Sequence, residues 1–515
     1  MNIQFTGHPV VDYGLVSLRY LAGSEGDLSS AVSQLITLLT TDLEGTVRVF
    51  SGYLPNSVFS NPSAKATRKQ DISSFLSTLQ HMVSRRGTGD LVCSICGCFC
   101  PDDALLHARK DRLPFLYGDA NFYPLLAPGL ELCGLCALAV VAALPAMMQA
   151  GNTFLLMHVQ DEKAALGLAK QAIDTVRANV LAGHFALHSY PSVRTPEAAL
   201  LYSLHDLLTK SYADYLYLEH SRYPKTLWSV RSGNQTDDVR IEYLTIPHAV
   251  LVFMDRVVDY EQRERVSPSF VPILYRSLKI SRSVLRGGNI LELDREGAPN
   301  GAWYGHRMYL QEVMQMDGSY IASIERIGIA IAASPRAKNH VESLRQESSA
   351  RTLARILHQL VADGAIEKED ARILLAYDNP LLLADAVRAV AYDYIRCVQN
   401  GVPFHRYTGE PIPADKMIET IERVAQRVAQ SHHNLRSVYV SMVKESSPKS
   451  IRRTYVRWVS YGWMDWQEFI TLCPIGEEKA DLQKMQKYRD FLAACIAWHA
   501  RQKGIDTTLP EEEES

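Results

Sequence analysis

The chain has 515 residues, of which 47% are hydrophobic and 22% are charged, as in ordinary globular proteins. This length accommodates about two to four domains, each with its own core. The formal net charge of −3 excludes a polycation, so any nucleic-acid binding must come from local basic patches or from partner subunits.

The N-terminal part combines helical and strand-like patterns. Apolar spacing predicts helical structure between Leu15 and Leu39, and the run VRVF (Val47–Phe50) favours a short strand. A polar loop, NSVFSNPSAKATRK, follows. The apolar run from Leu135 to Met148 contains Pro145 and is shorter than the about 20 residues that a membrane span needs. We therefore predict a buried helix there and no membrane association.

Three strands are predicted in the next hundred residues. The run TFLLMHV (Thr153–Val159) has the continuous apolar character of a buried strand. Within residues 226–256, VRIEYLTI and HAVLVFM read as two further strands.

From about residue 265 onward the strand patterns end. Apolar residues recur at spacings of three and four, as in Leu353–Leu360 and Ile418–Val428, which is the periodicity of amphipathic helices. We therefore predict an α+β protein with three parts. The first is a mixed α/β domain over 1–300 with a zinc knuckle inserted at about 91–136. The second is an all-α helical bundle over 301–510, and the third is an acidic tail over 511–515.

Four of the nine cysteines form two CxxC pairs. They are Cys93, Cys96, Cys133 and Cys136. Each pair supplies two thiolates, and four thiolates complete a tetrahedral structural Zn²⁺ site. Cys98 and Cys100 lie beside the first pair and are alternative ligands. The other interpretation is that all of them are free buried thiols. A catalytic zinc needs an open position and usually a His or carboxylate ligand, and no HExxH or HxE motif accompanies the cysteines.

We expect a cytoplasmic location. The first residues, MNIQFTGHPVVDYG, lack the basic segment and apolar stretch of a secretory signal. In the reducing cytosol, cysteines are thiols or metal ligands rather than disulfides.

Two segments carry rows of cations. The first row consists of Arg276, Lys279, Arg282 and Arg286, whose spacing places all four on one face of a helix. Such a row can follow a phosphate backbone. A solvated helix face is the alternative.

The second row lies in the segment KSIRRTYVRW. Arg452, Arg453 and Arg457 fall together on a helix, with Tyr455 and Trp458 among them. Arg binds phosphates and aromatic rings stack on bases, so we predict nucleic-acid contact here. The alternative is that both rings face the core.

Known catalytic motifs are largely missing from the sequence. It has no GxxxxGK[ST] phosphate loop and no GxSxG elbow. His205-Asp206 matches the dipeptide of metal-dependent phosphohydrolases, but it lies in an amphipathic segment without further histidines. We expect a protein that is not an enzyme.

The opening segment TGHPVVDYGLVSL resembles the N-terminal signature of the large subunit of type I-A and I-B CRISPR Cascade complexes. Gly7, Pro9, Asp12 and Gly14 match its Gly-x-Pro-x-x-Asp-x-Gly pattern. The loop YLPNSVFSNPS resembles the family's Asn-Ser and Asn-Pro stretch, and two CxxC pairs are common in its N-terminal third. The resemblance covers about the first 140 residues.

This resemblance implies a role in RNA-guided recognition of DNA. The family's large subunit holds the crRNA 5′ handle, recognises the protospacer-adjacent motif (PAM) on target double-stranded DNA and promotes R-loop formation. Its helical bundle resembles the small subunit, which contacts the target and non-target strands. Its partners are the backbone, handle-binding and small subunits of Cascade, and a recruited helicase-nuclease or transposition proteins perform the downstream step.

Polar groups in the N-terminal part are then candidates for contact with the PAM duplex or the guide handle, because amides and cations read base edges. They are Asn56, Ser57, Asn61, Arg68 and Lys69. Alternatively, Asn61-Pro62 is only a turn. Arg85 and Arg86 are weaker candidates for nucleic-acid contact.

Two other classes of function stay open. One is a stand-alone zinc-binding regulator that binds duplex DNA without RNA. The other is a metal-dependent nuclease that uses His205 and Asp206.

Overall fold

The computed structural model describes residues 4–51, 57–60, 65–107, 130–190, 193–231, 240–263, 302–346, 349–376, 380–407, 409–410, 412–431, 434–444, 447–473 and 479–507. The chain divides into two units, Met1–Asp259 and Tyr260–Ser515. The predicted boundary near residue 300 and the acidic tail lie outside the described residues. We describe each unit by itself.

The first unit begins with a group of helices: α1 (Pro9–Ala22), α2 (Leu28–Thr40), α3 (Leu43–Phe50), α4 (Arg68–Val83) and α5 (Gly134–Ala143). The helical pattern predicted from Leu15 to Leu39 is confirmed, but it is divided between α1 and α2. The break comes at Gly23, whose φ of 66° favours glycine, and α2 restarts where Asp27 accepts a hydrogen bond from the backbone N–H of Ser30.

The predicted strand VRVF is wrong, because these residues form the second half of α3. Asp42 caps this helix by accepting a hydrogen bond from the N–H of Gly45 at 2.9 Å. Burial of Thr46 and Phe50, four residues apart, is a helical spacing. A four-residue apolar run does not distinguish the two structures, and packing decided it.

A five-stranded sheet forms the centre of the first unit, in the order β7-β5-β6-β8-β9. The strands are β5 (Met148–Ala150), β6 (Thr153–His158), β7 (His188–Ser189), β8 (Thr226–Arg231) and β9 (Arg240–Thr245). All neighbouring pairs are antiparallel except β5 and β7. The strands predicted in TFLLMHV and VRIEYLTI are confirmed as β6 and β9.

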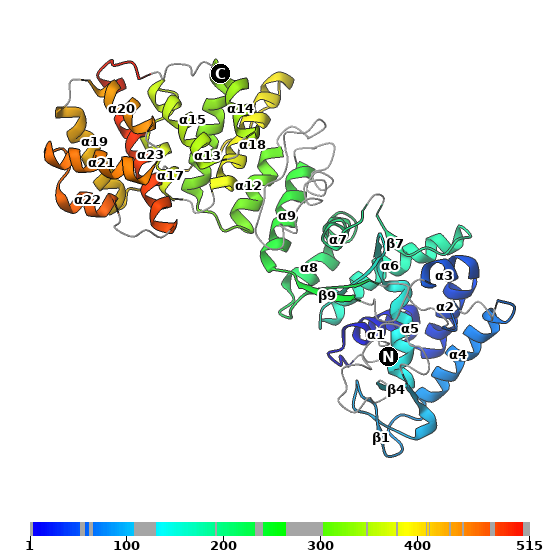
Figure 1. Ribbon diagram of the computed structural model, residues 1–515. Coiled ribbons are helices and arrows are strands. Elements are labelled where there is room, and N and C mark those ends of the chain that lie inside the picture. The colour runs from blue at the N-terminus through cyan, green and yellow to red at the C-terminus, as the bar shows by residue number, and fades with distance from the viewer. Residues whose placement is uncertain are drawn as a thin grey trace. The chain divides into compact units, whose positions relative to one another are not determined.

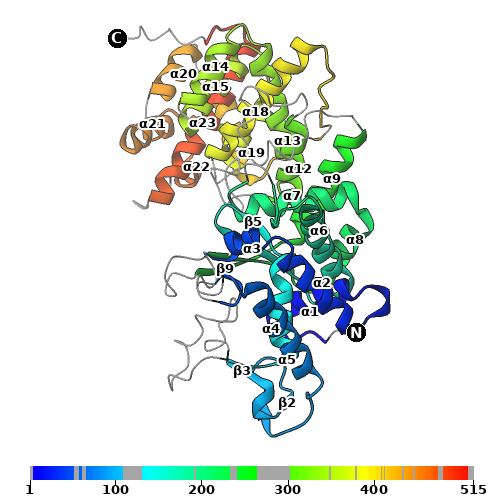
Figure 2. The same ribbon diagram turned by 90° about the vertical axis from the view of Figure 1, so that its right-hand side faces the viewer.

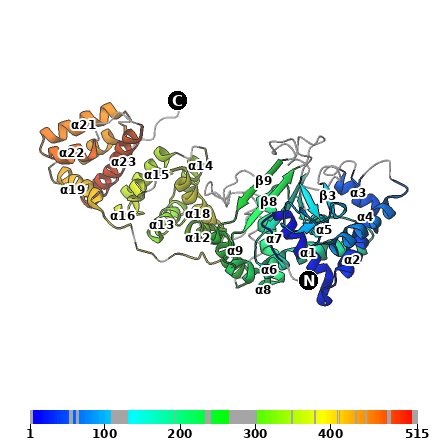
Figure 3. The ribbon, with the colours of Figure 1, turned by 90° about the horizontal axis from the view of Figure 1, so that it is seen from below.

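The predicted strand HAVLVFM is wrong, because it forms the start of helix α9 (His248–Arg263). Val250, Met254 and Val257 are buried, and this spacing continues beyond the apolar run that was read as a strand. The helices α6 (Glu162–Leu181), α7 (Pro196–Lys210) and α8 (Tyr212–His220) complete the unit. Figure 3 shows α1, α6 and α8 on one side of strands β8 and β9.

The Gly-x-Pro-x-x-Asp-x-Gly segment has a structural explanation. Gly7 has a φ of 88°, and Pro9 is the first residue of α1. The carboxylate of Asp12 is fully buried and accepts hydrogen bonds from the N–H and hydroxyl of Thr6 and from the N–H of Gly7. A Cβ at Gly14 would lie 1.7 Å from the carbonyl oxygen of Ala139, so glycine allows α1 to pack directly on α5.

The described residues of the second unit are helical, without strands. The helices are α12 (Ala302–Glu312), α13 (Gly318–Ala333), α14 (Ala337–Gln346), α15 (Ala350–Ala362), α16 (Lys368–Ala371), α17 (Ile373–Ala376), α18 (Pro380–Asn400), α19 (Lys416–Ser431), α20 (Leu435–Lys444), α21 (Pro448–Ser460), α22 (Trp466–Leu472) and α23 (Lys479–Gln502). The long helix α23 packs against α15, α19 and α20 (Figure 1).

The helical spacing predicted around Leu353–Leu360 and Ile418–Val428 is confirmed as α15 and α19, and their apolar residues are buried. Within the described parts of the chain, no helix is both long and apolar enough to cross a membrane. The described residues thus form a mostly helical, mixed α+β protein with a small sheet and a cluster of four cysteines.

Candidate metal centre

Two short antiparallel hairpins hold the cysteine cluster. Strands β1 (Leu91–Val92) and β2 (Phe99–Cys100) form the first, and β3 (Leu105–His107) and β4 (Glu131–Cys133) form the second. Figure 2 shows β2 and β3 beside the ends of α4 and α5. The hairpins bring together two cysteine pairs that are far apart in the sequence.

The first pair lies in the turn between β1 and β2. The N–H of Gly97 donates to the carbonyl of Cys93 at 3.0 Å, and the N–H of Cys93 donates to the carbonyl of Cys98 at 2.9 Å. Gly97 has a φ of 70°, which only glycine adopts readily. This tight turn directs the thiols of Cys93 and Cys96 to the same side.

The second pair spans the junction of β4 and α5. Cys133 is the N-cap residue of α5, and Cys136 lies in its first turn. The positive end of the helix dipole therefore faces both sulfurs. A Cβ at Gly134 would lie 2.6 Å from the Cβ of Met82, so glycine allows α4 to pack against this junction.

The sulfur atoms of these four cysteines lie within 4.8 Å of one another, so they could hold a metal ion. The Sγ atoms of Cys96 and Cys133 are 3.7 Å apart. Tetrahedral coordination with Zn–S bonds of about 2.3 Å places neighbouring sulfurs about 3.8 Å apart. Among the described residues, these four form the single group of His, Cys, Asp and Glu side chains with ligand spacing.

The electrostatics of the cluster favour a cation. Hydrogen bonding with the Cys133 thiol lowers the pKa of Cys93 to about 6 and lowers the pKa of Cys96 below its usual range. Hydrogen bonding with Cys133 and burial raise the pKa of Cys136. Without a metal, the buried sulfurs share protons because several thiolates in so small a volume repel one another. A divalent ion bound to all four removes that conflict.

Arg86, which the sequence suggested only as a nucleic-acid contact, lies at this centre. Its Nη2 atom donates to Cys96 Sγ at 3.6 Å, and its guanidinium also hydrogen-bonds to Cys98. Burial lowers the pKa of Arg86, but these bonds and the charge of Cys133 raise it overall. The guanidinium offsets part of the negative charge of a four-thiolate site. Because it points towards the sulfurs, it contacts the cysteine cluster instead of extending into the solvent.

The other N-terminal residues that were predicted to contact nucleic acid differ in how exposed they are. Asn56 and Asn61 lie outside the described residues. Ser57 is buried, and its hydroxyl lies 3.2 Å from that of Ser60, so it faces inward. Arg68 is buried at the start of α4, whereas Lys69 is exposed. Arg85 forms an ion pair with Asp103.

The first predicted row, Arg276, Lys279, Arg282 and Arg286, also lies outside the described residues. The second row lies on α21, whose N-cap Ser447 accepts from the N–H of Ser450 at 3.1 Å. Arg453 and Arg457 are exposed. Arg452 is half-buried and hydrogen-bonds to the thiol of Cys473.

The two aromatic residues inside this segment are buried, whereas Arg453 and Arg457 are exposed. Tyr455 is fully buried and Trp458 is 4% exposed, so their rings pack in the core and cannot stack on bases. Three exposed neighbours were not predicted as contacts from the sequence: Lys449, Tyr461 and Trp466. The spacing of Lys449, four residues before Arg453, was the available signal.

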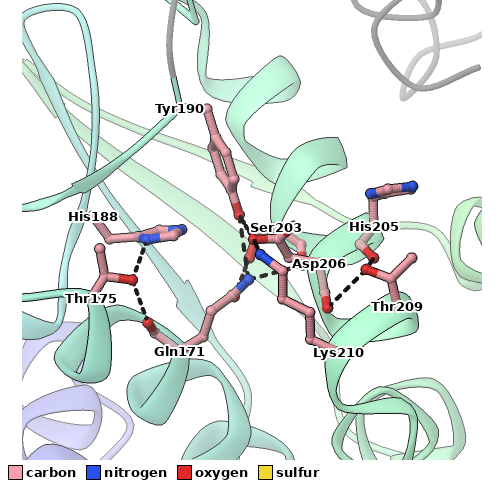
Figure 4. Close-up of polar contacts among 9 residues, drawn as sticks. All are labelled: Gln171, Thr175, His188, Tyr190, Ser203, His205, Asp206, Thr209 and Lys210. Atoms are coloured by element: carbon pink, nitrogen blue, oxygen red, sulfur yellow. Dashed lines mark hydrogen bonds and ion pairs between the residues drawn. The ribbon is translucent and has the colours of Figure 1, made fainter. Parts of the chain in front are cut away.

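The His205-Asp206 dipeptide does not form a metal-ligand group among the described residues. Asp206 accepts hydrogen bonds from the hydroxyl of Tyr190 at 3.3 Å and the ammonium of Lys210 at 2.9 Å. Figure 4 shows the ring of His205 pointing away from this network. The nearby His188 hydrogen-bonds to Thr175 at 2.8 Å, and burial lowers the pKa of His188 to about 4.

Compared with protein-family models, curated proteins and solved structures, the chain matches none.

Proposed function

We propose that this chain is a nucleic-acid-binding protein whose first unit is braced by a structural Zn²⁺ ion held by Cys93, Cys96, Cys133 and Cys136. One observation carries the proposal of nucleic-acid binding. An exposed row of cations on α21 lies next in sequence to two exposed aromatic rings.

The cation row consists of Lys449, Arg453 and Arg457, spaced four residues apart on one helical face. Four residues correspond to about 6 Å of rise along a helix. None of the three side chains forms an ion pair with any residue that the structure describes. As far as the described residues are concerned, each charge is therefore available for a phosphate group, and release of counterions would favour binding.

The aromatic rings belong to Tyr461, at the end of α21, and Trp466, at the start of α22. Each is 60% exposed. Trp466 stacks on Phe469 with ring centroids 4.9 Å apart, which holds the indole in place. Base stacking on an aromatic side chain contributes about 1–3 kcal/mol per base, independently of sequence. Cations with exposed rings are the composition of a single-strand binding surface.

Within this class, we propose the large subunit of a type I-A or I-B CRISPR Cascade complex. The support is the resemblance of the Gly7–Gly14 segment and the Tyr53–Ser63 loop, together with the two CxxC pairs. In this proposal the α/β part with its zinc knuckle binds the crRNA handle and the PAM duplex. The helical part contacts the target and non-target strands, and a recruited helicase-nuclease or transposition protein supplies catalysis.

The binding surface is tested by charge reversal. Arg453→Glu with Arg457→Glu should weaken binding of the full chain to single-stranded DNA of any sequence. It should also reduce the slope of log K against log salt by about 1.4, since each lost phosphate contact contributes about 0.7. Lys338→Glu with Lys416→Glu, exposed cations on α14 and α19, is the charge-matched control. Equal slopes in the two double variants would refute the surface.

The family assignment needs a separate experiment. The chain is co-expressed with the products of its neighbouring genes and purified, and any bound RNA is sequenced. A bound guide RNA with a constant 5′ end is expected. Specific duplex binding by the isolated chain without RNA would instead support a stand-alone regulator.

A further inference from the structure

Two cysteines beside the metal centre are not needed by it. The Sγ atoms of Cys98 and Cys100 lie 3.6 Å apart. Neither belongs to the group of four sulfurs with metal-ligand spacing. A tetrahedral site is complete with four thiolates, so these two sulfurs form a separate dithiol.

The local backbone holds the two thiols together. Alternate residues of an extended segment share a face, so Cys98 and Cys100 lie on one side and Phe99 on the other. Phe99 is 54% exposed, whereas Cys100 is fully buried. The carbonyl of Cys98 accepts from the N–H of Cys93, and Cys100 pairs with Leu91 across the hairpin. The dithiol is therefore a fixed part of the knuckle.

We propose that Cys98 and Cys100 form a reversible redox site, which is oxidised to an intramolecular disulfide while the four zinc ligands remain bound. A disulfide needs the sulfurs at about 2.05 Å, so the remaining gap of about 1.5 Å must close by side-chain rotation together with a local shift of the backbone between Cys98 and Cys100. Disulfides in reducing compartments are usually transient and redox-sensing, which fits a site of this kind.

The co-reactant is a low-molecular-weight disulfide such as oxidised glutathione. The half-buried Cys98 gives up its proton to the solvent as its Sγ attacks one sulfur of the reagent, and the other half of the reagent leaves as a thiol. Cys100 then attacks Cys98 Sγ, forms the intramolecular bond and releases the second thiol. The pair loses two electrons and two protons, and the reagent gains them. Metal coordination protects the other four sulfurs from this exchange.

The experiment uses the full chain, purified with its zinc and equilibrated with mixtures of reduced and oxidised glutathione. Unreacted thiols are blocked by alkylation, disulfides are mapped by peptide mass spectrometry, and zinc is measured by elemental analysis. We expect loss of two thiols, a linkage between Cys98 and Cys100, unchanged zinc content and full reversal by dithiothreitol. Phenylarsine oxide, which binds close thiol pairs, should block the oxidation.

Cys98→Ser and Cys100→Ser should each abolish the loss of two thiols. Cys397→Ser, which changes a buried cysteine of the second unit, should leave it unchanged. A linkage that includes Cys96 or Cys133, zinc loss in parallel with thiol loss, or thiols that stay reduced in fully oxidised glutathione would each overturn the proposal. The parent's own peptide map decides the question even where a variant fails to fold.

The redox proposal depends on the proposed metal site in one respect: the metal is taken to hold the other four sulfurs and to keep them from being oxidised. A purified chain without zinc would count against that site. The dithiol would still stand if the linkage between Cys98 and Cys100 were the first to form, and would fall if another pair formed first.

Discussion

Asn in place of Asp12 tests the contacts that fix the N-terminus of α1. In the parent chain, Oδ1 accepts from the N–H and hydroxyl of Thr6 at 2.6 and 2.7 Å. Oδ2 accepts from the N–H of Gly7 at 3.0 Å and lies 3.0 Å from Nε2 of His158. Asn keeps one acceptor oxygen but places an amide NH₂ opposite the Gly7 and His158 donors.

The size of the expected loss of stability follows from these unfavourable donor–donor contacts. A buried polar group left without its partner costs about 1–3 kcal/mol, and more for a charged one. The N–H of Gly7 would face the new amide NH₂ and lose the acceptor that it has in the parent chain, whereas the ring nitrogen of His158 can accept from that amide in one of its tautomers. We therefore expect Asp12→Asn to destabilise the first unit by about 2–4 kcal/mol.

The effect should depend on pH. Burial raises the pKa of Asp12, but hydrogen bonds from His158 and Thr6 outweigh it and hold the pKa below the ordinary value of 3.8. The stabilisation is therefore fully present above that ordinary value and is lost as the pH falls through the lower folded-state pKa. The difference in stability between parent and Asp12→Asn should accordingly shrink below about pH 4.

Native-state hydrogen exchange of the α1 amides is the suitable assay, because a chain of two units does not have a single free energy of unfolding. Asp27→Asn is the control, since Asn and Asp cap helices equally well and Asp27 is an exposed cap. Protection of α1 in Asp12→Asn that equals the control, or a difference that stays constant down to pH 2, would refute the reasoning.

Three further changes have defined outcomes. Gly14→Ala forces a Cβ into the carbonyl oxygen of Ala139 on α5 and should cost about 3 kcal/mol or more in the hydrogen-exchange protection of α1. Gly23→Ala meets no atom within 4 Å and should cost about 1–3 kcal/mol, because a φ of 66° with a ψ of −155° is a backbone conformation that essentially only glycine adopts. A loss in Gly14→Ala that does not exceed the loss in Gly23→Ala would contradict the packing argument. Arg86→Gln should speed zinc transfer to a chelator by about tenfold, because the lost guanidinium no longer offsets the thiolate charge, and an unchanged rate would remove Arg86 from the centre. Glu325→Gln should lower the hydrogen-exchange stability of α13 by about 3–5 kcal/mol. Glu325 accepts a hydrogen bond from Trp303 Nε1 at 2.6 Å, and its replacement leaves buried Arg307 without a counter-charge. A change below about 1 kcal/mol would argue against a buried ion pair.

The cysteine cluster was the part of the candidate site that the sequence predicted best. A CxxC turn is a local structure, so each pair of neighbouring thiols was predictable, whereas the pairing of β3 with β4 brings the second pair to the first. The strands β6 and β9 were also predictable, since each has a clear apolar or alternating run. The two wrong strands, Val47–Phe50 and HAVLVFM, are short apolar runs whose local pattern fits a helix equally well.

By itself, the sequence determined the two CxxC turns, the helical character of the second half of the chain and the position of α21, because each depends on residues close together in the chain. Only the tertiary structure decided which side of each element faces inward. Packing buries Tyr455 and Trp458, exposes Lys449 with Arg453 and Arg457, and turns Arg86 towards the sulfurs. The physical reason is that helical periodicity places residues on faces, but the neighbouring elements determine which face is removed from water.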